Sequence, residues 1–339
     1  MPARKWTPPS PAESCACLER CKPFHTLATK GAQLYPPMTP EQGGGWLADG
    51  QPGEVDRGGQ TLAQWRTNSW PQRLPQPPPP NRRRRKTDTA CKICLVPLGN
   101  LGGLDVDALA TCVRAFYLGA TVELLPAVAA KKLRASTKSR AGDDEYGEQI
   151  ETHSCHKLLQ NLMPSDAFIV VGLTLFDLYP RDDWAFVYGE ASASRGTGVF
   201  SFARYGSVDL DPKAFLRRAM WVLCHEIGHL FGLSHCIWWK CTMNGTNGGD
   251  LENMPMHLCP MDLTKLHEAL AFDVIEREQA LKALWTSLGF DEDAQFSQQL
   301  LSALTSDKAP AGGRATAAAK VVCPPCVGAK VPPSVKRLL

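Results

Sequence analysis

Apolar positions from residue 91 onward change repeatedly between the spacing of a strand and that of a helix. In CKICLVPLGNLGG, from Cys91 to Gly103, an apolar run forms a short buried strand that glycines end. Helical spacing follows from Asp105 to Tyr117, and the segment 120–128 resembles a second strand. Cys91 and Cys94 form a CxxC, but no helix follows it, unlike in a redox motif. We therefore expect the two cysteines to be core residues or to lie at the end of a strand.

The alternation continues toward the carboxyl end and predicts a domain that mixes helices and strands. We expect helices over 147–162, 215–230 and 263–290, and strands over 166–180, 184–192 and 197–206. His153 and His156 lie on the first of these helices, where solvent exposure or capping is favoured over metal ligation.

The two ends of the chain lack this periodicity. Residues 1–88 are rich in Pro and Gly and include QPPPPNRRRRK from Gln76 to Lys86, which is typical of a polyproline linker followed by a charge run. We expect little packed structure there, a folded domain over 89–305 and a disordered tail over 306–339. The basic run is interpreted as solvated linker, with nuclear import as the alternative. Cys15, Cys17 and Cys21 lack a second cysteine pair, which disfavours a metal knuckle.

Composition narrows the classes of function. The 339 residues are 44% hydrophobic, enough for a core, and the formal charge is +3 from 37 basic and 34 acidic residues, which does not indicate a nucleic-acid partner. No apolar run suits a signal peptide or a membrane span, so we expect an intracellular protein with no membrane partner, located in the cytoplasm, with the nucleus as the alternative. The 13 cysteines are then expected as thiols, metal ligands or core residues.

The segment CHEIGHLFGLSHC, residues 224–236, carries candidate chemistry. His225 and His229 are four residues apart, which places both imidazoles on one helix face and lets them share a Zn²⁺ at ~2.1 Å. Gly232 allows a left-handed turn that returns His235 as the third ligand, leaving the fourth position to water. Glu226 lies beside the metal without ligating it, the place of a general base for peptide hydrolysis. A chance HExxH does not explain Gly232 and His235.

The same segment resembles a known family. HEIGHLFGLSH matches the elongated metzincin motif HExxHxxGxxH, and Met243 follows at a distance suited to the Met-turn. Within the metzincins the chain is most similar to the archaemetzincins, which carry a cysteine directly after the third histidine and more cysteines downstream; the likeness extends over about Cys91 to Phe290. The resemblance implies an α+β, metzincin-like zincin with a mixed twisted sheet, an active-site helix and a small C-terminal subdomain.

The resemblance also implies a second, structural zinc site in the segment 236–262. Its ligands would be Cys236, Cys241 and Cys259, but Asp262 stands where the family has a fourth cysteine. A carboxylate can ligate zinc, and His257 or the pair Cys323 and Cys326 are alternatives. The thiols would otherwise be plain buried residues.

We therefore predict a monomeric zinc metallopeptidase with two zinc ions per chain, acting on a peptide or protein. The alternative is a zinc-stabilised scaffold or interaction protein that has lost peptidase action. Glu226 favours the enzyme, because a binding module has no chemical need for that carboxylate.

Overall fold

The computed structural model describes residues 34–35, 59–67, 91–142, 145–206, 208–236, 239–245, 251 and 253–305. The expectations for the early cysteines, the basic run, the Cys323 and Cys326 pair and the tail lie outside these residues. Among the residues described, no helix combines the length and the apolar character needed to cross a membrane.

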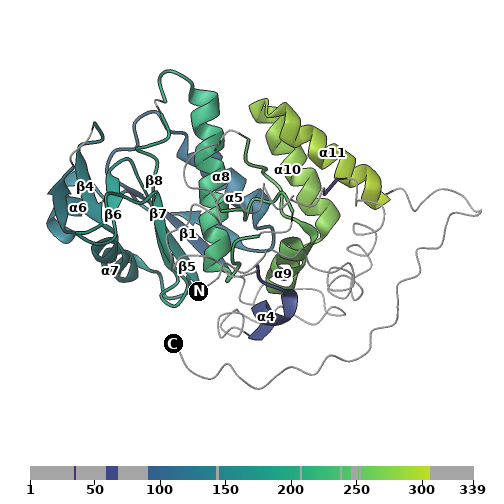
Figure 1. Cartoon of the computed structure of the whole chain (residues 1–339), viewed down its shortest axis with the longest axis horizontal. Helices are drawn as coiled ribbons and strands as arrows, with labels where there is room; N and C mark the ends of the chain where they lie inside the picture. Colours follow the sequence, from purple (N-terminus) through teal and green to yellow (C-terminus); the bar gives the residue numbers. More distant parts are fainter. Residues whose placement is uncertain are drawn as a thin grey trace, which may run out of the picture.

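A five-stranded sheet forms the centre of the amino-terminal part (Figure 1). It consists of β1 (Lys92–Leu98), β2 (Thr121–Leu124), β5 (Ile169–Thr174), β7 (Gly189–Ser192) and β8 (Thr197–Ser201), in the order β2-β1-β5-β8-β7. All neighbours are parallel except β7, which runs antiparallel to β8 at the edge. The mixed sheet expected from the sequence is confirmed.

Helices cover both faces of this sheet, and the strand residues alternate accordingly. Ile93 and Leu95 of β1 face the cluster that includes α5 (Val106–Phe116) and α8 (Pro212–Leu230), whereas Cys94 and Val96 face α6 (Ala130–Ser136) and α7 (Thr152–Leu162). Both cysteines of the CxxC are buried, as predicted. Because successive side chains of a strand point to opposite faces, β1 is apolar throughout.

A smaller sheet contains β3 (Ser139–Ala141), β4 (Glu148–Glu151) and β6 (Asp177–Tyr179), in the order β3-β4-β6. Its presence corrects two predictions. The expected helix over 147–162 begins as β4, because Ile150 pairs with Leu178, and becomes α7 only at Thr152. The expected strand over 166–180 divides into β5 and β6, which belong to different sheets.

Among the described residues 260–305, three helices follow one another: α9 (Pro260–Leu270), α10 (Val274–Leu288) and α11 (Asp291–Thr305). The prediction of one helix over 263–290 is wrong, because Ala271 adopts a left-handed conformation (φ 51°) and Asp273 caps a new helix by accepting from the backbone N–H of Glu276. The helices α10 and α11 pack together beside α5 and away from the sheet (Figure 1).

A short upstream helix, α4 (Leu62–Thr67), packs against α9. Leu62, Trp65 and the isolated Tyr35 are at most 4% exposed and join the main core. This differs from the expectation of little packed structure before residue 89. The apolar residues of this segment are too few to show helical periodicity, although they are large enough to fill space in the core.

Candidate active site and metal centres

The helix α8 places the first two histidines on one face. Asp211 caps its start by accepting from the backbone N–H of Ala214, and Pro212 occupies the first turn, where a missing N–H has no cost. The helix is buried along most of its length, which fixes its rotation against the sheet. As a result, the Nε2 atoms of His225 and His229 are 3.1 Å apart.

The chain turns directly after α8 and returns the third histidine. Gly232 has φ 74°, the left-handed region that glycine adopts without steric cost. The ring centroid of His235 lies 5.2 Å from that of His225 and 4.9 Å from that of His229. One ligand atom from each of the three lies within 4.8 Å of the others, so the predicted histidine set is brought together.

Two of the histidines are oriented by backbone carbonyls. His225 Nδ1 is 2.8 Å from the carbonyl of Thr242, and His229 Nδ1 is 2.7 Å from that of Leu233. An Nδ1–H that donates to a carbonyl leaves Nε2 with its lone pair for a cation. Burial lowers the pKa of His225 well below its usual value, and the neighbouring His229 and His235 lower it further. The neutral imidazole, which ligates metal, is therefore the favoured form.

Glu226 follows His225 on α8 and is not part of the ligand group. Burial raises the pKa of this carboxyl to about 7, an effect that His235 opposes. A carboxyl with a pKa near neutrality can take a proton and later release it, which is what general acid–base catalysis requires.

Met243 lies beneath the helix between the first two histidines. A Cβ built on Gly228 would come within 2.4 Å of Met243 Sδ, so a side chain at position 228 would displace the methionine. Met243 is fully buried. This is the position that the predicted Met-turn would occupy.

A second group of potential ligands lies nearby and contains all four predicted residues. Cys236, Cys241, Cys259 and Asp262 are each at most 4% exposed, and one ligand atom from each lies within 4.8 Å of the others. Asp262 Oδ2 is 3.4 Å from Sγ of both Cys241 and Cys259. The alternative fourth ligand, His257, is not in the group; its ring stacks on Phe296 with centroids 3.7 Å apart.

Local backbone structure holds these thiols in place. Cys259 precedes α9, and its Sγ accepts from the backbone N–H of Asp262 at the positive end of that helix. Asn244 accepts from the N–H of Cys241 and donates to the carbonyl of Cys236. Burial raises the pKa of Cys241 and Cys259, so these thiols are neutral when alone, whereas a bound cation would favour the thiolates. Three sulfurs and one carboxylate oxygen are a donor set that suits zinc.

Lys265 is a residue of this region that the sequence analysis did not single out. Its Nζ lies 2.8 Å from Asp262 Oδ1, and both side chains are 2% exposed. The i,i+3 spacing on a helix was the available signal, but only the buried position shows that the pair belongs to the thiol cluster.

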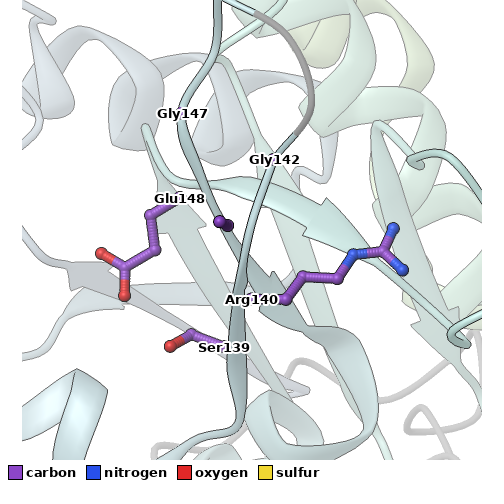
Figure 2. Close-up of a pocket in the computed structure, with 6 residues that line it drawn as sticks. Ser139, Arg140, Gly142, Gly147 and Glu148 are labelled. Carbon is purple, nitrogen blue, oxygen red and sulfur yellow. The ribbon is translucent and has the colours of Figure 1, made fainter.

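A surface pocket lies elsewhere, at the hairpin of β3 and β4, and is not part of either centre. Figure 2 shows Arg140 and Glu148 pointing away from each other there. Arg140 donates to the carbonyls of Asp182 and Ala185, and Glu148 pairs with Arg134 at 2.7 Å. Since both charged groups have structural partners, this pocket has no evident chemistry.

Comparison with known proteins finds a family match over the part of the chain that holds both ligand groups. Residues 138–266, which include both ligand groups and Glu226, match the model of Peptidase family M54. Archaemetzincin-2 of Homo sapiens is 37% identical over 198 residues, covering 50% of this chain and 54% of that protein. Archaemetzincin-2 of Rattus norvegicus is 36% identical over 225 residues, covering 56% and 62% respectively.

The chain thus spans about half the length of the curated relatives that it matches. A solved structure of archaemetzincin from Methanopyrus kandleri aligns with 55% of this chain and 98% of its own, with 25% identity and a TM-score of 0.45. The sequence matches confirm the predicted resemblance to the archaemetzincins.

Proposed function

We propose that the chain is a zinc-dependent metallopeptidase that hydrolyses peptide bonds in a peptide or protein substrate. The convergence of His225, His229 and His235, with Glu226 beside them and outside the ligand group, carries the proposal. The match of residues 138–266 to a peptidase family supports it.

Each side chain has a distinct role in this proposal. The three histidines would hold the catalytic zinc, His225 and His229 through Nε2 because their Nδ1 atoms face backbone carbonyls. When bound, zinc would act as a Lewis acid on the substrate carbonyl and lower the pKa of the attacking water. Glu226 takes the proton from that water and passes it to the leaving amine, a role that its pKa of about 7 suits.

The edge strand β7 offers a surface for an extended substrate. It is the last strand of the sheet and packs beside α8. A peptide that pairs with a sheet edge gains main-chain hydrogen bonds without a demand on its sequence. We place the substrate there, with its scissile bond at the histidines.

We further propose a second, structural zinc held by Cys236, Cys241, Cys259 and Asp262. Four donor atoms already cluster in a buried site, as expected for a closed structural centre. Both ligand sets lie within one chain, which supports a monomer, and the thiols must stay reduced to bind metal, which favours an intracellular setting.

A comparison of two variants tests the function. Glu226→Ala should retain the catalytic zinc and lose roughly 10²- to 10⁴-fold in peptide hydrolysis, because the carboxylate moves a proton and is not a ligand. His229→Ala should lose both activity and one zinc. Metal analysis and cleavage of a peptide library are measured on the same preparations. Full activity in Glu226→Ala would exclude the mechanism, and wild type that binds zinc but cleaves nothing would favour the scaffold.

A further inference from the structure

The turn between the second and third histidines is held by a segment from far upstream. Gln60 Nε2 donates to the carbonyl of Gly232 at 3.0 Å, and Gln60 Oε1 accepts from the N–H of Ser234 at 3.3 Å. The indole N–H of Trp65 donates to the carbonyl of Phe231 at 3.0 Å. Two side chains therefore bind three backbone groups of a single turn.

The two side chains that make these contacts are buried. Gln60 is 8% exposed and Trp65 is 3% exposed, although glutamine is usually a surface residue. The carbonyls of Phe231 and Gly232 lie just past the end of α8, where no further helical turn supplies a partner. Without Gln60 and Trp65, these carbonyls would lose the hydrogen bonds that compensate for their burial.

The turn controls two of the three histidines. Its Leu233 carbonyl is 2.7 Å from His229 Nδ1 and so fixes the orientation of that ring. His235 follows Ser234 directly, so its position depends on the path of the same backbone. A shift of the turn would therefore rotate one ligand and displace another.

The upstream segment is ordered by its own helix cap and by an ion pair to α9. Thr61 and Gln64 exchange hydrogen bonds at the start of α4, Thr61 N–H to Gln64 Oε1 at 2.8 Å and Gln64 N–H to Thr61 Oγ1 at 3.2 Å, the reciprocal pattern of a capping box. Arg66 at the other end pairs with Glu268 of α9. We call residues 59–67 the brace.

We propose that Gln60 and Trp65 are positioning residues of the catalytic centre, which hold the turn 231–234 so that His229 and His235 face the zinc. The inference rests on the proposed function. Outer partners that orient metal ligands typically contribute 10- to 100-fold to metal affinity or activity. Since Gln60 and Trp65 act through the backbone, we expect the lower end of that range.

The test uses the full chain with two variants and a matched control. Gln60→Ala removes both amide contacts, and Trp65→Phe keeps an aromatic ring in the core while removing the donor. Ala63→Ser is the control, because it changes an exposed residue of the same brace. Cobalt(II) is titrated into each metal-free protein, since its visible absorption distinguishes histidine ligation from thiolate ligation. The zinc enzymes are then compared in kcat and KM.

Both brace variants should bind cobalt(II) at the histidines roughly 10-fold more weakly, with unchanged binding at the thiolates. Their kcat should fall with little change in KM, because the brace does not contact substrate, whereas Ala63→Ser should match wild type. Wild-type affinity at the histidines in both variants would overturn the proposal, as would an equal loss in Ala63→Ser. Wild type that binds no metal at the histidines would overturn this inference and the function together; wild type that binds metal there but cleaves nothing would overturn the function alone.

Discussion

At the residue scale, the carboxylate of Asp262 is shared between the thiol cluster and the ammonium group of Lys265. Oδ1 accepts from Lys265 Nζ, while Oδ2 faces the thiols of Cys241 and Cys259. Burial raises the pKa of Asp262, an effect that Lys265 opposes. In the proposed second zinc site, Lys265 would also offset part of the negative charge that three thiolates and a carboxylate would bring to the ion. Substitution of Asp262 or Lys265 alone should therefore destabilise the protein, whereas substitution of both together should be tolerated.

Substitution of this pair gives a prediction. Asp262→Cys alone would complete a set of four thiolates but leave the buried ammonium of Lys265 without its partner. Such an unpaired charge costs about 3–5 kcal/mol, so this variant should unfold at a lower temperature than wild type despite its better ligand. Asp262→Cys combined with Lys265→Met should recover stability and retain the second zinc more tightly than wild type.

Thermal melting and zinc retention against a graded chelator measure both effects. The single variant Lys265→Met completes the double-mutant cycle. If Asp262→Cys alone is as stable as the double variant, the two side chains do not act together. If zinc retention is indifferent to residue 262, Asp262 is not a ligand.

At the scale of elements, α4 contributes to the core although it lies outside the periodic sequence. Trp65→Ala should lower the free energy of unfolding by about 3–5 kcal/mol, because it opens a cavity and removes a buried hydrogen bond. Ala63→Ser, on the exposed side of the same helix, should stay within about 0.5 kcal/mol of wild type. Denaturant unfolding of the two variants measures the difference, and equal stability would show that α4 does not pack as described.

Removal of residues 1–85 tests the contribution of α4 together with the rest of the upstream segment. The sequence alone predicts almost no effect, but the deletion takes away Tyr35, Leu62 and Trp65, which are buried in the core. We now expect a clear fall in melting temperature and in activity. Removal of residues 1–33 takes away none of these three residues and serves as the comparison. Equal melting temperatures for both truncated chains would show that residues 34–85 do not contribute to the stability of the core.

Local patterns predicted some of these elements well and others poorly, for identifiable reasons. The active-site helix and its histidines follow from spacings within one short stretch, so α8 and the ligand set were predictable. The boundary at Thr152 was not, because β4 exists through pairing with β6, which is distant in sequence. Neither was the break at Ala271, a non-glycine residue in the left-handed region. The contacts of Gln60 join residues 172 positions apart, and no local pattern reports them.

At the scale of the whole molecule, the two proposed metal centres share one short segment. The Thr242 carbonyl lies 2.8 Å from His225 Nδ1 at the catalytic centre, whereas its neighbour Cys241 belongs to the thiol cluster. The N–H of Cys236, the residue after His235, donates to the carbonyl of Met243 at 2.7 Å. This bond links the chain beside the third histidine to the segment below the histidine cluster. A metal bound by the thiolates would therefore tighten the backbone that supports the histidines.

This coupling gives a final prediction. Cys259→Ala should hold one zinc fewer, melt at a lower temperature and bind the catalytic zinc roughly 10-fold more weakly, although Cys259 does not contact a histidine ligand. Cys155→Ala is the matched control, since Cys155 is equally buried but packs in the cluster on the opposite face of the sheet. It should lose only the stability of a small cavity and keep both metals. Zinc content and chelator competition decide the outcome: normal affinity at the histidines in Cys259→Ala would mean that the two centres are independent, because the loss of one would then leave the backbone of the other undisturbed.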